Sequence, residues 1–482
     1  MSSENLDTVI DQYFAPISAK VAAFVFYAEP FSGYDIKLIL IWLAGAALFF
    51  TVYLGFPNLR YFGHALAIAR NKFDAPSSGD GQISSFQALM TSLSGTVGLG
   101  NIAGVAVAVS VGGPGAAFWM AVMGVLGMAT KFAEASLGVK YRVQHEHNPE
   151  LVLGGPMYYI RAAFDRHNLS RVGKAIAWLF CLCCIGGAIG GGNMFQANQS
   201  YQQVLNVTGG DASFLADKGW LFGVGLAILT GLVILGGIRS IANVSSKIVP
   251  FMGVLYLIAG LYVIGAHYEN IPHALATIFT SALSPEAGIG AVIGALLMGV
   301  QRAAFSNEAG MGSGAIVHAA ARTNQPLTQG FVGMLGPFID TVIICMITAL
   351  VIVVTGAYEG STGMEGVALT SRAFEQGISF FPYILALTVF LFAFSTLIAW
   401  SYLGEVCAAY IFGENKAVVM TYKIIFLVFI VIGAASKLSN IIDFSDAIFL
   451  AMAVPNCIAL FLLAPELKRD LKKYLQDFKK TA

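Results

Sequence analysis

The sequence predicts an all-α membrane protein with about eleven transmembrane helices, and three observations lead to this fold class. Of the 482 residues, 57% are hydrophobic and only 11% are charged, whereas soluble domains carry about 25% charged residues. Apolar segments long enough to cross a bilayer recur along the chain. Two of these segments also hold clusters of glycine and polar residues near their middle. A soluble fold would have to cover far too much apolar surface.

The predicted spans are apolar runs of at least about 20 residues, the length that a helix needs to cross a bilayer. The stretch before them mixes apolar and polar positions and lacks the basic start of a signal peptide. We therefore expect residues 9–27 to lie on the membrane surface as an amphipathic segment. The spans are 36–56, 83–110, 114–141, 172–203, 218–238, 244–266, 286–321, 327–356, 379–411, 417–436 and 444–465.

Lysine and arginine are concentrated in alternate loops, and cytoplasmic loops are the ones enriched in these residues. The loop after the third span and the C-terminal tail carry many of them, whereas the loop after the sixth span carries none. Eleven spans with the N-terminus outside and the C-terminus in the cytoplasm satisfy nearly every loop. Ten or twelve spans would misplace either the tail or the long basic loop.

Composition and motifs argue against several other classes of protein. The formal net charge is zero, and no basic block suits a nucleic acid. All six cysteines fall in apolar segments, which is not a disulfide framework, and Cys181, Cys183 and Cys184 have no histidine or carboxylate beside them for a metal site. No span carries a zinc, serine or paired-aspartate catalytic motif, so we do not expect this protein to be an enzyme. A channel would need a more continuous polar lining.

Two predicted spans contain matching interruptions, in which Asn-x-Ala-Gly lies within a glycine cluster. The second span reads Gly98-Leu-Gly-Asn-Ile-Ala-Gly104, and the seventh reads Phe305-Ser-Asn-Glu-Ala-Gly-Met-Gly-Ser-Gly314. Glycines can serve close helix packing alone, but that explains the polar neighbours less well. Unpaired backbone groups at this depth cost several kcal/mol unless they line a cavity or bind something. The interruptions therefore predict two broken helices around a binding site.

The two interrupted spans each open a group of five spans, which predicts an internal repeat. Because five is an odd number, the second group crosses the membrane in the opposite sense to the first, as in inverted-repeat transporters. The predicted organisation is an extracytoplasmic N-terminal segment, an extra transmembrane helix, two five-helix repeats and a cytoplasmic basic tail. Their bounds are 1–35, 36–56, 83–266, 286–465 and 466–482.

A break in a membrane helix offers two kinds of backbone group to a ligand. The half-helix after the break presents free N–H groups and a positive dipole end, which suit a carboxylate. The half-helix before it presents free carbonyl groups, which suit Na⁺ or an ammonium group. A zwitterionic amino acid meets both demands, so the breaks favour a secondary transporter for amino acids.

Ordered motifs between residues 40 and 465 resemble the alanine/glycine:cation symporter family. The resemblance implies Na⁺-driven, in some members H⁺-driven, uptake of alanine or glycine, and a leucine-transporter-type 5+5 inverted repeat preceded by one extra helix. A symporter for a larger neutral amino acid such as glutamine is the alternative. The motifs are Gln87-Ala-Leu-Met-Thr91, Gly98-Leu-Gly-Asn-Ile-Ala-Gly104, Gly112-Gly-Pro-Gly-Ala116, Phe118-Trp-Met120, Gly127-Met-Ala-Thr-Lys131, Gly154-Gly-Pro-Met-Tyr158, Val249-Pro-Phe-Met252, Phe305-Ser-Asn-Glu-Ala-Gly310 and Trp400-Ser-Tyr402.

The resemblance assigns the first break to substrate and ion. It implies that the backbone from Gly98 through Leu99 to Gly100 faces the substrate carboxylate, with the apolar side chain at Leu99 narrowing the pocket. Thr96 and Asn101 would add side-chain oxygens, Thr96 to the substrate and Asn101 to the cation. The alternative for Thr96 is a hydroxyl bonded back to its own helix.

Other residues complete the implied substrate pocket. Phe305 would be its lid or wall, although simple packing is the alternative, and Ser306 would contact the substrate. Asn307 would be a ligand of the ion or the substrate. On the fourth span, Gln196 is polar on an apolar helix and is expected to contact the substrate, and Trp400 would be a further pocket wall.

Hydroxyls on the ninth span are expected to bind the sodium ion. The resemblance implies that Ser395 and Thr396 share Na⁺ with carbonyl groups near Ser94 and Val97 in a five-oxygen cage. In membrane helices such hydroxyls more often bond their own backbone, and that alternative stays open.

Charged residues inside spans cost roughly 2.5–3.5 kcal/mol each near the centre, so each is a functional candidate. Asp340 is expected to be a cation ligand or a partner of a broken helix. Arg302 and Glu308 flank the second break and could form a gating ion pair with each other or with loops. Lys131 and Glu134, three residues apart, are expected to pair locally near the membrane interface.

The expected partners are few. They are a small amino acid, Na⁺ with H⁺ as the other candidate cation, and the lipid bilayer of the plasma (inner) membrane. We expect neither a nucleic acid nor an obligate protein partner, because the sequence shows no feature that would bind one.

Overall fold

The computed structural model describes residues 6–31, 34–70, 80–145, 148–283, 289–360 and 366–481. Within these ranges, seven helices are long and apolar enough to cross a membrane, or eight if the bent pair Ser85–Thr96 and Leu99–Gly112 is one span. Three shorter apolar helices accompany them. The chain is therefore a multi-pass membrane protein, and the count of eleven spans stays a prediction.

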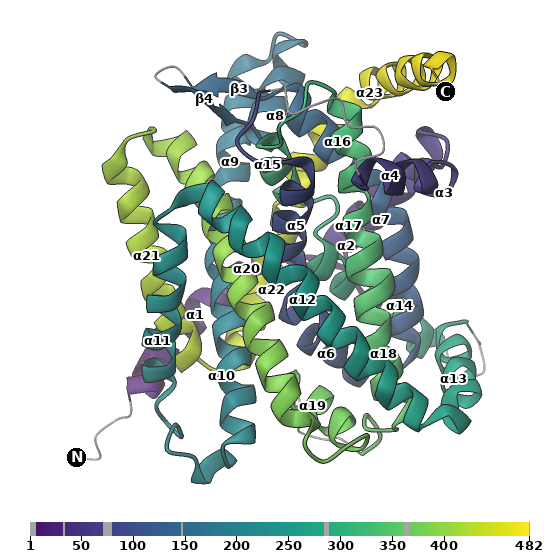
Figure 1. Ribbon diagram of the computed structural model, residues 1–482, viewed down its shortest axis with the longest axis vertical. Coiled ribbons are helices and arrows are strands. Elements are labelled where there is room, and N and C mark those ends of the chain that lie inside the picture. The colour runs from purple at the N-terminus through teal and green to yellow at the C-terminus, as the bar shows by residue number, and fades with distance from the viewer. Residues whose placement is uncertain are drawn as a thin grey trace.

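Helices form wherever the sequence predicts a span in the first half of the chain (Figure 1). Some spans are made of several consecutive pieces. The elements are α1 (Leu6–Val25), β1 (Ala28–Phe31), β2 (Tyr34–Lys37), α2 (Leu38–Tyr53), α3 (Pro57–Arg60), α4 (Phe62–Ala69), α5 (Ser85–Thr96), η1 (Leu99–Asn101), α6 (Ala103–Gly112), α7 (Gly115–Lys140), β3 (Val143–His145), β4 (Asn148–Leu153), α8 (Pro156–Asp165), α9 (Ser170–Ile189), η2 (Gly190–Met194), α10 (Phe195–Val207), η3 (Gly210–Ala212), α11 (Gly219–Ile234) and α12 (Gly237–Ala266).

The second half follows the same pattern. Its last helix runs without interruption from the final predicted span into the basic tail. The elements are η4 (Tyr268–Asn270), α13 (Ile271–Leu283), α14 (Ile289–Asn307), α15 (Ser313–Ala319), α16 (Pro326–Gly333), α17 (Leu335–Pro337), η6 (Phe338–Cys345), α18 (Met346–Val354), α19 (Val367–Glu375), α20 (Phe381–Phe412), α21 (Lys416–Ala435), α22 (Leu438–Ala451) and α23 (Ala453–Thr481).

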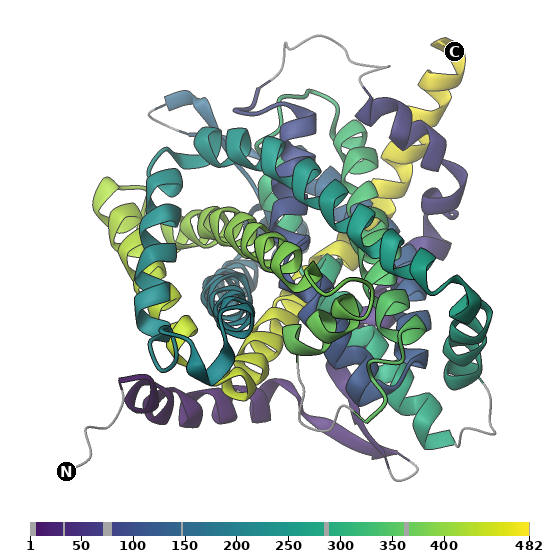
Figure 2. The same ribbon diagram turned by 60° about the horizontal axis from the view of Figure 1, so that its bottom comes forward.

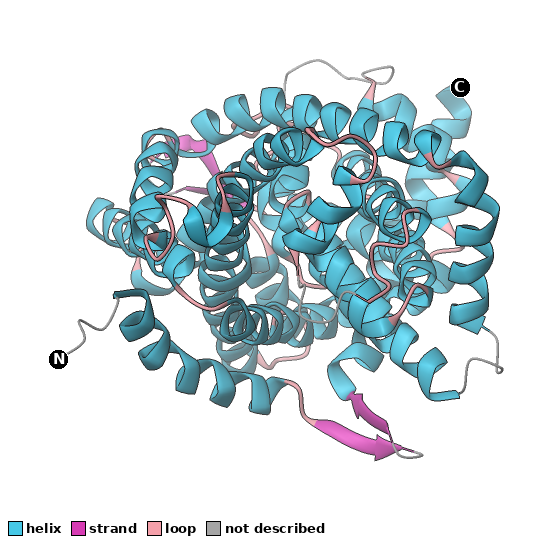
Figure 3. Cartoon of the chain, turned by 90° about the horizontal axis from the view of Figure 1, so that it is seen from below, coloured by secondary structure: helices cyan, strands magenta, loops and turns pink. Residues whose placement is uncertain are grey.

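The fold departs from an all-helical chain at two short antiparallel hairpins, drawn in magenta in Figure 3. Strand β1 pairs with β2, with Ala28 opposite Lys37, and β3 pairs with β4, with Val143 opposite Leu153. Both lie in segments that flank the membrane helices. Strands this short leave no signal in a pattern of apolar runs of helical length, so they were not predicted.

The N-terminal segment consists of helix α1 followed by the first hairpin. Helix α1 packs against α22 and α21, and Figure 2 shows it lying along one edge of the molecule. It therefore contacts the helix bundle itself. Its predicted place on the membrane surface is not tested by this contact and stays a prediction.

The first predicted break is confirmed. A capping box starts α5, in which Ser84 Oγ accepts from the Gln87 backbone N–H at 3.1 Å and Gln87 Oε1 accepts from the Ser84 N–H at 3.0 Å. The helix ends at Thr96, and the following segment Leu99–Gly112 turns away by 57°. Val97 and Gly98 lie between the two halves.

The second predicted break is confirmed as well. Helix α14 ends at Asn307 and α15 starts at Ser313. Between them Glu308, Gly310 and Gly312 all have positive φ angles, of 57°, 94° and 85°. Only glycine adopts this conformation at little cost, so the glycines of the motif supply the turn. The strained Glu308 is held by its surroundings.

Two wide, π-helical turns interrupt other spans and were not predicted. One covers Gly190–Met194 between α9 and α10, and the other covers Phe338–Cys345 before α18. Such turns are rare and often occur at functional sites, because they leave backbone groups free of their usual partners. The first turn ends two residues before Gln196, and the second contains Asp340, so both involve residues selected from the sequence.

Candidate functional site

The first break is held open by side chains from its own turn and from α10. The Gly98 N–H donates to Asn101 Oδ1 at 2.9 Å, and the Leu99 N–H donates to Gln196 Oε1 at 3.0 Å. A Cβ on Gly98 would lie 2.4 Å from Thr396 Oγ1, so only glycine fits against α20. The structure thus brings together five residues that the sequence predicts in the site.

Gln196 is buried and makes bonds in two directions. Its Oε1 accepts from the first break, and its Nε2 donates to the Gly191 carbonyl at 2.8 Å. That carbonyl belongs to the wide turn η2. The sequence predicts a substrate contact here, and the structure shows a side chain that ties the wide turn to the break.

Asp340 joins the two breaks. Asn101 Nδ2 donates to its Oδ1 at 2.6 Å, Ser306 Oγ donates to its Oδ2 at 2.5 Å, and Thr341 Oγ1 donates to its Oδ2 at 2.7 Å. Asn307 Nδ2 extends the network to Thr341 Oγ1 at 3.0 Å. Asp340 is 0% exposed, and these donors are neutral. The carboxylate oxygens of Asp340 and the hydroxyl oxygens of Ser306 and Thr341 are ligands that suit a hard cation such as Na⁺.

The two helices that carry the predicted sodium cage, α5 and α20, are in contact. Ser94 Oγ on α5 donates to the Ser395 carbonyl on α20 at 2.6 Å. The hydroxyls of Ser395 and Thr396 donate to the Phe392 carbonyl of their own helix, at 3.0 and 2.9 Å. Val97 is buried at the end of α5. The residues of the predicted cage are therefore adjacent, and the hydroxyls of Ser395 and Thr396 bond to the backbone of their own helix.

The hydroxyl of Thr96 is also bonded back to its own helix. Its Oγ1 donates to the carbonyls of Ser92 and Leu93 on its own helix, at 3.3 and 3.4 Å. These long bonds satisfy a buried hydroxyl at the last turn of α5.

Aromatic rings close one side of the breaks. Trp400 Nε1 donates to the Gly95 carbonyl at 3.2 Å and to Glu308 Oε1 at 3.1 Å. Its ring stacks on Phe449, with centroids 4.6 Å apart, and Phe449 lies 5.0 Å from Phe305. Phe195 packs on the Phe305 ring at 5.4 Å. Phe195 and Phe449 were not predicted, since an aromatic residue in an apolar span carries no local signal.

Gly100 lies close to the ring of Phe305. A Cβ at this position would be 3.2 Å from Phe305 Cδ1. The two breaks therefore meet at this point, backbone against ring.

The expected interfacial pair of Lys131 and Glu134 needs correction. The two do approach, with Nζ and Oε2 3.8 Å apart, but they are 1% and 0% exposed. Glu134 Oε1 accepts from the backbone N–H groups of Gly310 and Gly312, at 2.8 and 2.9 Å. Lys131 Nζ donates to the Glu308 carbonyl at 3.4 Å. The pair therefore supports the second break from within the protein.

Arg302 and Glu308 do not pair with each other. Arg302 forms an ion pair with Asp446 of α22, in which both side chains are 2% exposed. Gln301 Nε2 donates to the same carboxylate at 2.7 Å. Glu308 instead accepts from Trp400 and from the Ser313 hydroxyl. Asp446 was not predicted because its partner lies more than a hundred residues away in the sequence.

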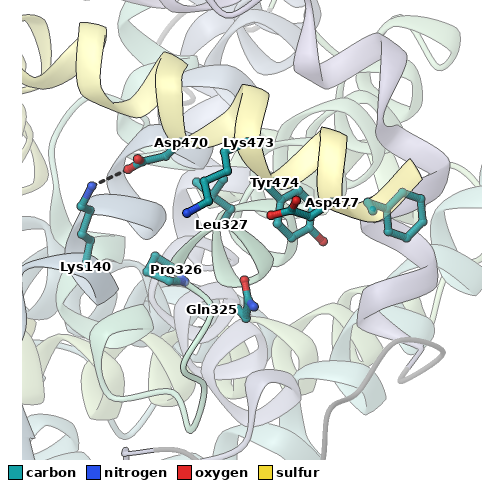
Figure 4. Close-up of a pocket in the computed structure, with 9 residues that line it drawn as sticks. Lys140, Gln325, Pro326, Leu327, Asp470, Lys473, Tyr474 and Asp477 are labelled. Carbon is teal, nitrogen blue, oxygen red and sulfur yellow. Dashed lines mark hydrogen bonds and ion pairs between the residues drawn. The ribbon is translucent and has the colours of Figure 1, made fainter. Parts of the chain in front are cut away.

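A pocket of about 610 Å³ lies apart from these residues, beside the C-terminal helix α23 (Figure 4). The C-terminal helix α23 forms one wall, with Asp470 and Tyr474, and Lys140 and Pro326 lie opposite. Its lining contains none of the residues that the sequence predicts in the site. We therefore assign the candidate site to the two breaks.

Comparison with known proteins is consistent with this arrangement. The family profile described as the sodium:alanine symporter family matches residues 22–482. The chain is 41% identical over 438 residues to the sodium/alanine symporter AgcS of Methanococcus maripaludis, which covers 90% of this chain and 93% of that protein. It is 32% identical over 445 residues to the probable sodium/glutamine symporter GlnT of Bacillus subtilis, covering 92% and 89%.

A solved structure supports the fold. The crystal structure of MhsT in complex with L-phenylalanine aligns with a TM-score of 0.54 at 15% identity, covering 80% of this chain and 89% of that one. At this identity the likeness concerns the fold alone. The sequence profile and the relatives decide the identity: the chain belongs to the sodium:alanine symporter family and is a cation-coupled amino acid symporter.

Proposed function

We propose that the protein takes up a small neutral amino acid, alanine or glycine, together with Na⁺ across the plasma (inner) membrane. The observation that carries this proposal is the junction of the two broken helices at Asn101, Ser306 and Asp340. A buried carboxylate surrounded by neutral oxygen and amide groups favours a bound cation. The relative named as a sodium/alanine symporter, at 41% identity, supports the same substrate and ion.

The proposed amino acid site lies where the first break meets Phe305. Its carboxylate would face the backbone from Gly98 to Gly100, because a half-helix start attracts negative charge. Thr96, Leu99, Gln196, Ser306 and Trp400 complete the proposed substrate site. Gly100 approaches Phe305 so closely that a Cβ on it would lie 3.2 Å from the ring, which favours a substrate with a small side chain.

Two groups of residues are proposed to bind Na⁺. The first is Asp340 with Asn101 and Asn307, which link both breaks. The second is the contact between α5 and α20, formed by Ser94, Val97, Ser395 and Thr396. In the second group the hydroxyls of Ser395 and Thr396 donate their hydrogens to the Phe392 carbonyl and keep their oxygen lone pairs for an ion.

We propose that the protein has eleven spans in a 5+5 inverted repeat preceded by the extra helix α2, with the N-terminus outside. In support, α4, α8 and the C-terminal part of α23, all in or beside basic segments, lie at one end of the molecule (Figure 1). Helices α13 and α19 lie at the opposite end. Basic segments gathered at one end fit a cytoplasmic side.

Transport would proceed by alternating access, in which the helices around the two breaks move against the rest of the bundle. The buried pair of Arg302 and Asp446 lies on the α14 side of the second break and is proposed as an outer gate. Each Na⁺ that enters the cell gains about 2.3 kcal/mol per 100 mV of membrane potential. That free energy, added to the ion gradient, would drive accumulation of the amino acid.

The proposal is tested in proteoliposomes loaded with K⁺ and given external Na⁺ and labelled alanine. We expect uptake that rises with external Na⁺ and with an inside-negative potential. Gly100→Leu should abolish uptake without preventing membrane insertion, because the larger side chain would collide with Phe305. Uptake that ignores both Na⁺ and pH would contradict cation coupling at this site.

A symporter for glutamine is the second candidate, favoured by the 32% identical relative named for that substrate. The two candidate functions are distinguished by competition of unlabelled amino acids against the uptake of labelled alanine, with and without Na⁺. Inhibition by alanine and glycine at concentrations well below those needed for glutamine is the expected result. The reverse order would assign the larger substrate.

A further inference from the structure

Arg142 lies just after α7 and forms hydrogen bonds with four backbone carbonyl groups. Its Nη1 donates to the carbonyls of Ala319 and Ala321, at 3.0 and 2.7 Å. Its Nη2 donates to the carbonyls of Asp80 and Thr323, at 2.7 and 2.6 Å. One guanidinium group thus binds two chain segments that are more than 200 residues apart in the sequence.

The two segments are the ends of the broken helices. Residues 80–83 lead into α5, the first half of the first broken helix, and residues 319–323 leave α15, the second half of the other one. They are also bonded to each other: Ile83 and Ala321 form a parallel bridge, Gln82 N–H donates to the Ala320 carbonyl at 2.9 Å, and Arg322 N–H donates to the Ile83 carbonyl at 2.7 Å.

The packing along this junction is close. A Cβ on Gly81 would lie 2.5 Å from the Ala321 carbonyl oxygen, so the two backbones are in direct contact. Helices α5 and α15 also contact each other beyond the junction, and α15 packs on α7. These bonds and contacts oppose any movement of α5 that leaves α15 behind.

We propose that Arg142 is a positioning residue that fastens α5 to α15, so that the two half-helices move as one unit during transport. This proposal rests on the alternating access proposed above, and it adds which parts move together. The opposite mechanism, in which α5 swings away alone, would require the bridge at Ile83 and the four bonds of Arg142 to open in every cycle.

Arginine is suited to this role in a way that lysine is not. Its planar guanidinium group offers five N–H donors in a fixed fork, whereas a lysine offers one compact ammonium group. Only the fork can reach carbonyls from both segments at once. The role therefore predicts that Arg142→Lys behaves nearly as poorly as Arg142→Ala.

A disulfide tests the proposal directly. Neighbouring strands lie about 4.8 Å apart, within the Cα separation of about 4.4–6.8 Å that a disulfide requires, so Ile83→Cys with Ala321→Cys should cross-link on oxidation. We expect the oxidised protein to keep Na⁺-driven alanine uptake within about twofold of the reduced protein. Loss of uptake on oxidation, restored by dithiothreitol, would overturn the proposal, because the segments would then have to separate.

A matched pair provides the control. Gln87 of α5 donates from Nε2 to Asn243 Oδ1 of α12 at 2.9 Å. If α5 moves with α15 against α12, then Gln87→Cys with Asn243→Cys, joined by a short bis-thiosulfonate reagent, should stop transport. Transport that survives this cross-link but is lost with the first one would assign the opposite moving parts and overturn the proposal.

Rescue separates positioning from a general structural role. Arg142→Ala should lower uptake at least about tenfold, because several charge-assisted hydrogen bonds are lost, and the disulfide between positions 83 and 321 should restore it. Wild-type uptake by Arg142→Ala, or a failure of the disulfide to restore it, would refute the proposal. If the unmodified protein shows no Na⁺-dependent uptake in the same vesicles, the proposed function fails instead.

Discussion

At the scale of single residues, Asp340 is the carboxylate on which both breaks converge. It is fully buried and receives hydrogen bonds from Asn101, Ser306 and Thr341. A buried charge without a counter-charge is costly, and a bound Na⁺ would supply one. The sequence selected this residue only because a charge in an apolar span is rare. Its partners were also chosen from the sequence, except Thr341.

Replacing Asp340 by asparagine tests the ion site. The amide has nearly the same shape but no charge, so we expect the Na⁺ concentration for half-maximal uptake to rise at least about tenfold. The measurement is alanine uptake as a function of external Na⁺. Glu375→Gln, which alters an exposed carboxylate on α19, should leave the Na⁺ dependence unchanged. An unchanged Na⁺ dependence in Asp340→Asn would remove this residue from the ion site.

Gly98 is the most closely packed of the four glycines Gly95, Gly98, Gly100 and Gly104 around the first break. Because its Cβ would lie 2.4 Å from Thr396 Oγ1, Gly98→Ala should force α5 and α20 apart, at a cost of roughly 1–3 kcal/mol. We expect uptake to be largely lost while the protein still inserts in the membrane. Gly104→Ala, where a Cβ meets nothing within 4 Å, is the matched control. Equal effects of both substitutions would contradict a specific contact at Gly98.

At the scale of elements, the two broken helices are stabilised by different means. The first break is stabilised by amide side chains, with Asn101 and Gln196 accepting from its N–H groups. The second is stabilised by a carboxylate, because Glu134 accepts from the N–H groups of Gly310 and Gly312 just before α15. A negative charge at a helix N-terminus is favourable. The two breaks therefore have similar sequences but are stabilised by different acceptors, amides at the first and a carboxylate at the second.

This difference leads to a prediction at Glu134. In Glu134→Ala, two buried N–H groups lose their acceptor, each at a cost of about 1–3 kcal/mol. We expect a clearly lower melting temperature of the detergent-solubilised protein, with transport lost. Glu375→Ala, on the exposed face of α19, should melt as the wild type does. A normal melting temperature in Glu134→Ala would show that the bonds to Gly310 and Gly312 contribute little.

At the scale of the whole molecule, the distribution of basic residues determines the expected orientation. The basic loops and the C-terminal helix lie at the same end (Figure 1), although the loops are separated along the chain by many spans. Ion pairs hold that end together: Glu466 of α23 pairs with both Lys140 and Arg166. The orientation proposed above, with this end in the cytoplasm, would account for this concentration of basic residues.

Orientation is tested by labelling single cysteines with a membrane-impermeant maleimide. Both Arg469 on α23 and Asp211 on η3 are exposed. We expect Arg469→Cys to react only after the cells are permeabilised, and Asp211→Cys to react in intact cells. The reverse pattern would invert the proposed topology, and labelling of both positions in intact cells would rule out an odd number of spans between them.

Much of this protein follows from its sequence. The membrane class, the places of the helices and the two breaks were all predicted, because each depends on a local property: apolar length, or glycine at a position that needs a positive φ. Most candidate site residues lie together for the same reason, since the motifs that mark the breaks also carry the polar side chains.

Other features were decided only by tertiary structure. The partner of Arg302, the burial of Lys131 and Glu134, the aromatic wall of Phe195 and Phe449, and the two wide π-helical turns all depend on which helices pack together. A pairing between residues a hundred or more positions apart leaves no periodic trace in the sequence. It becomes visible only when the helices are assembled, because packing, and not local preference, determines which side chains meet in the membrane interior.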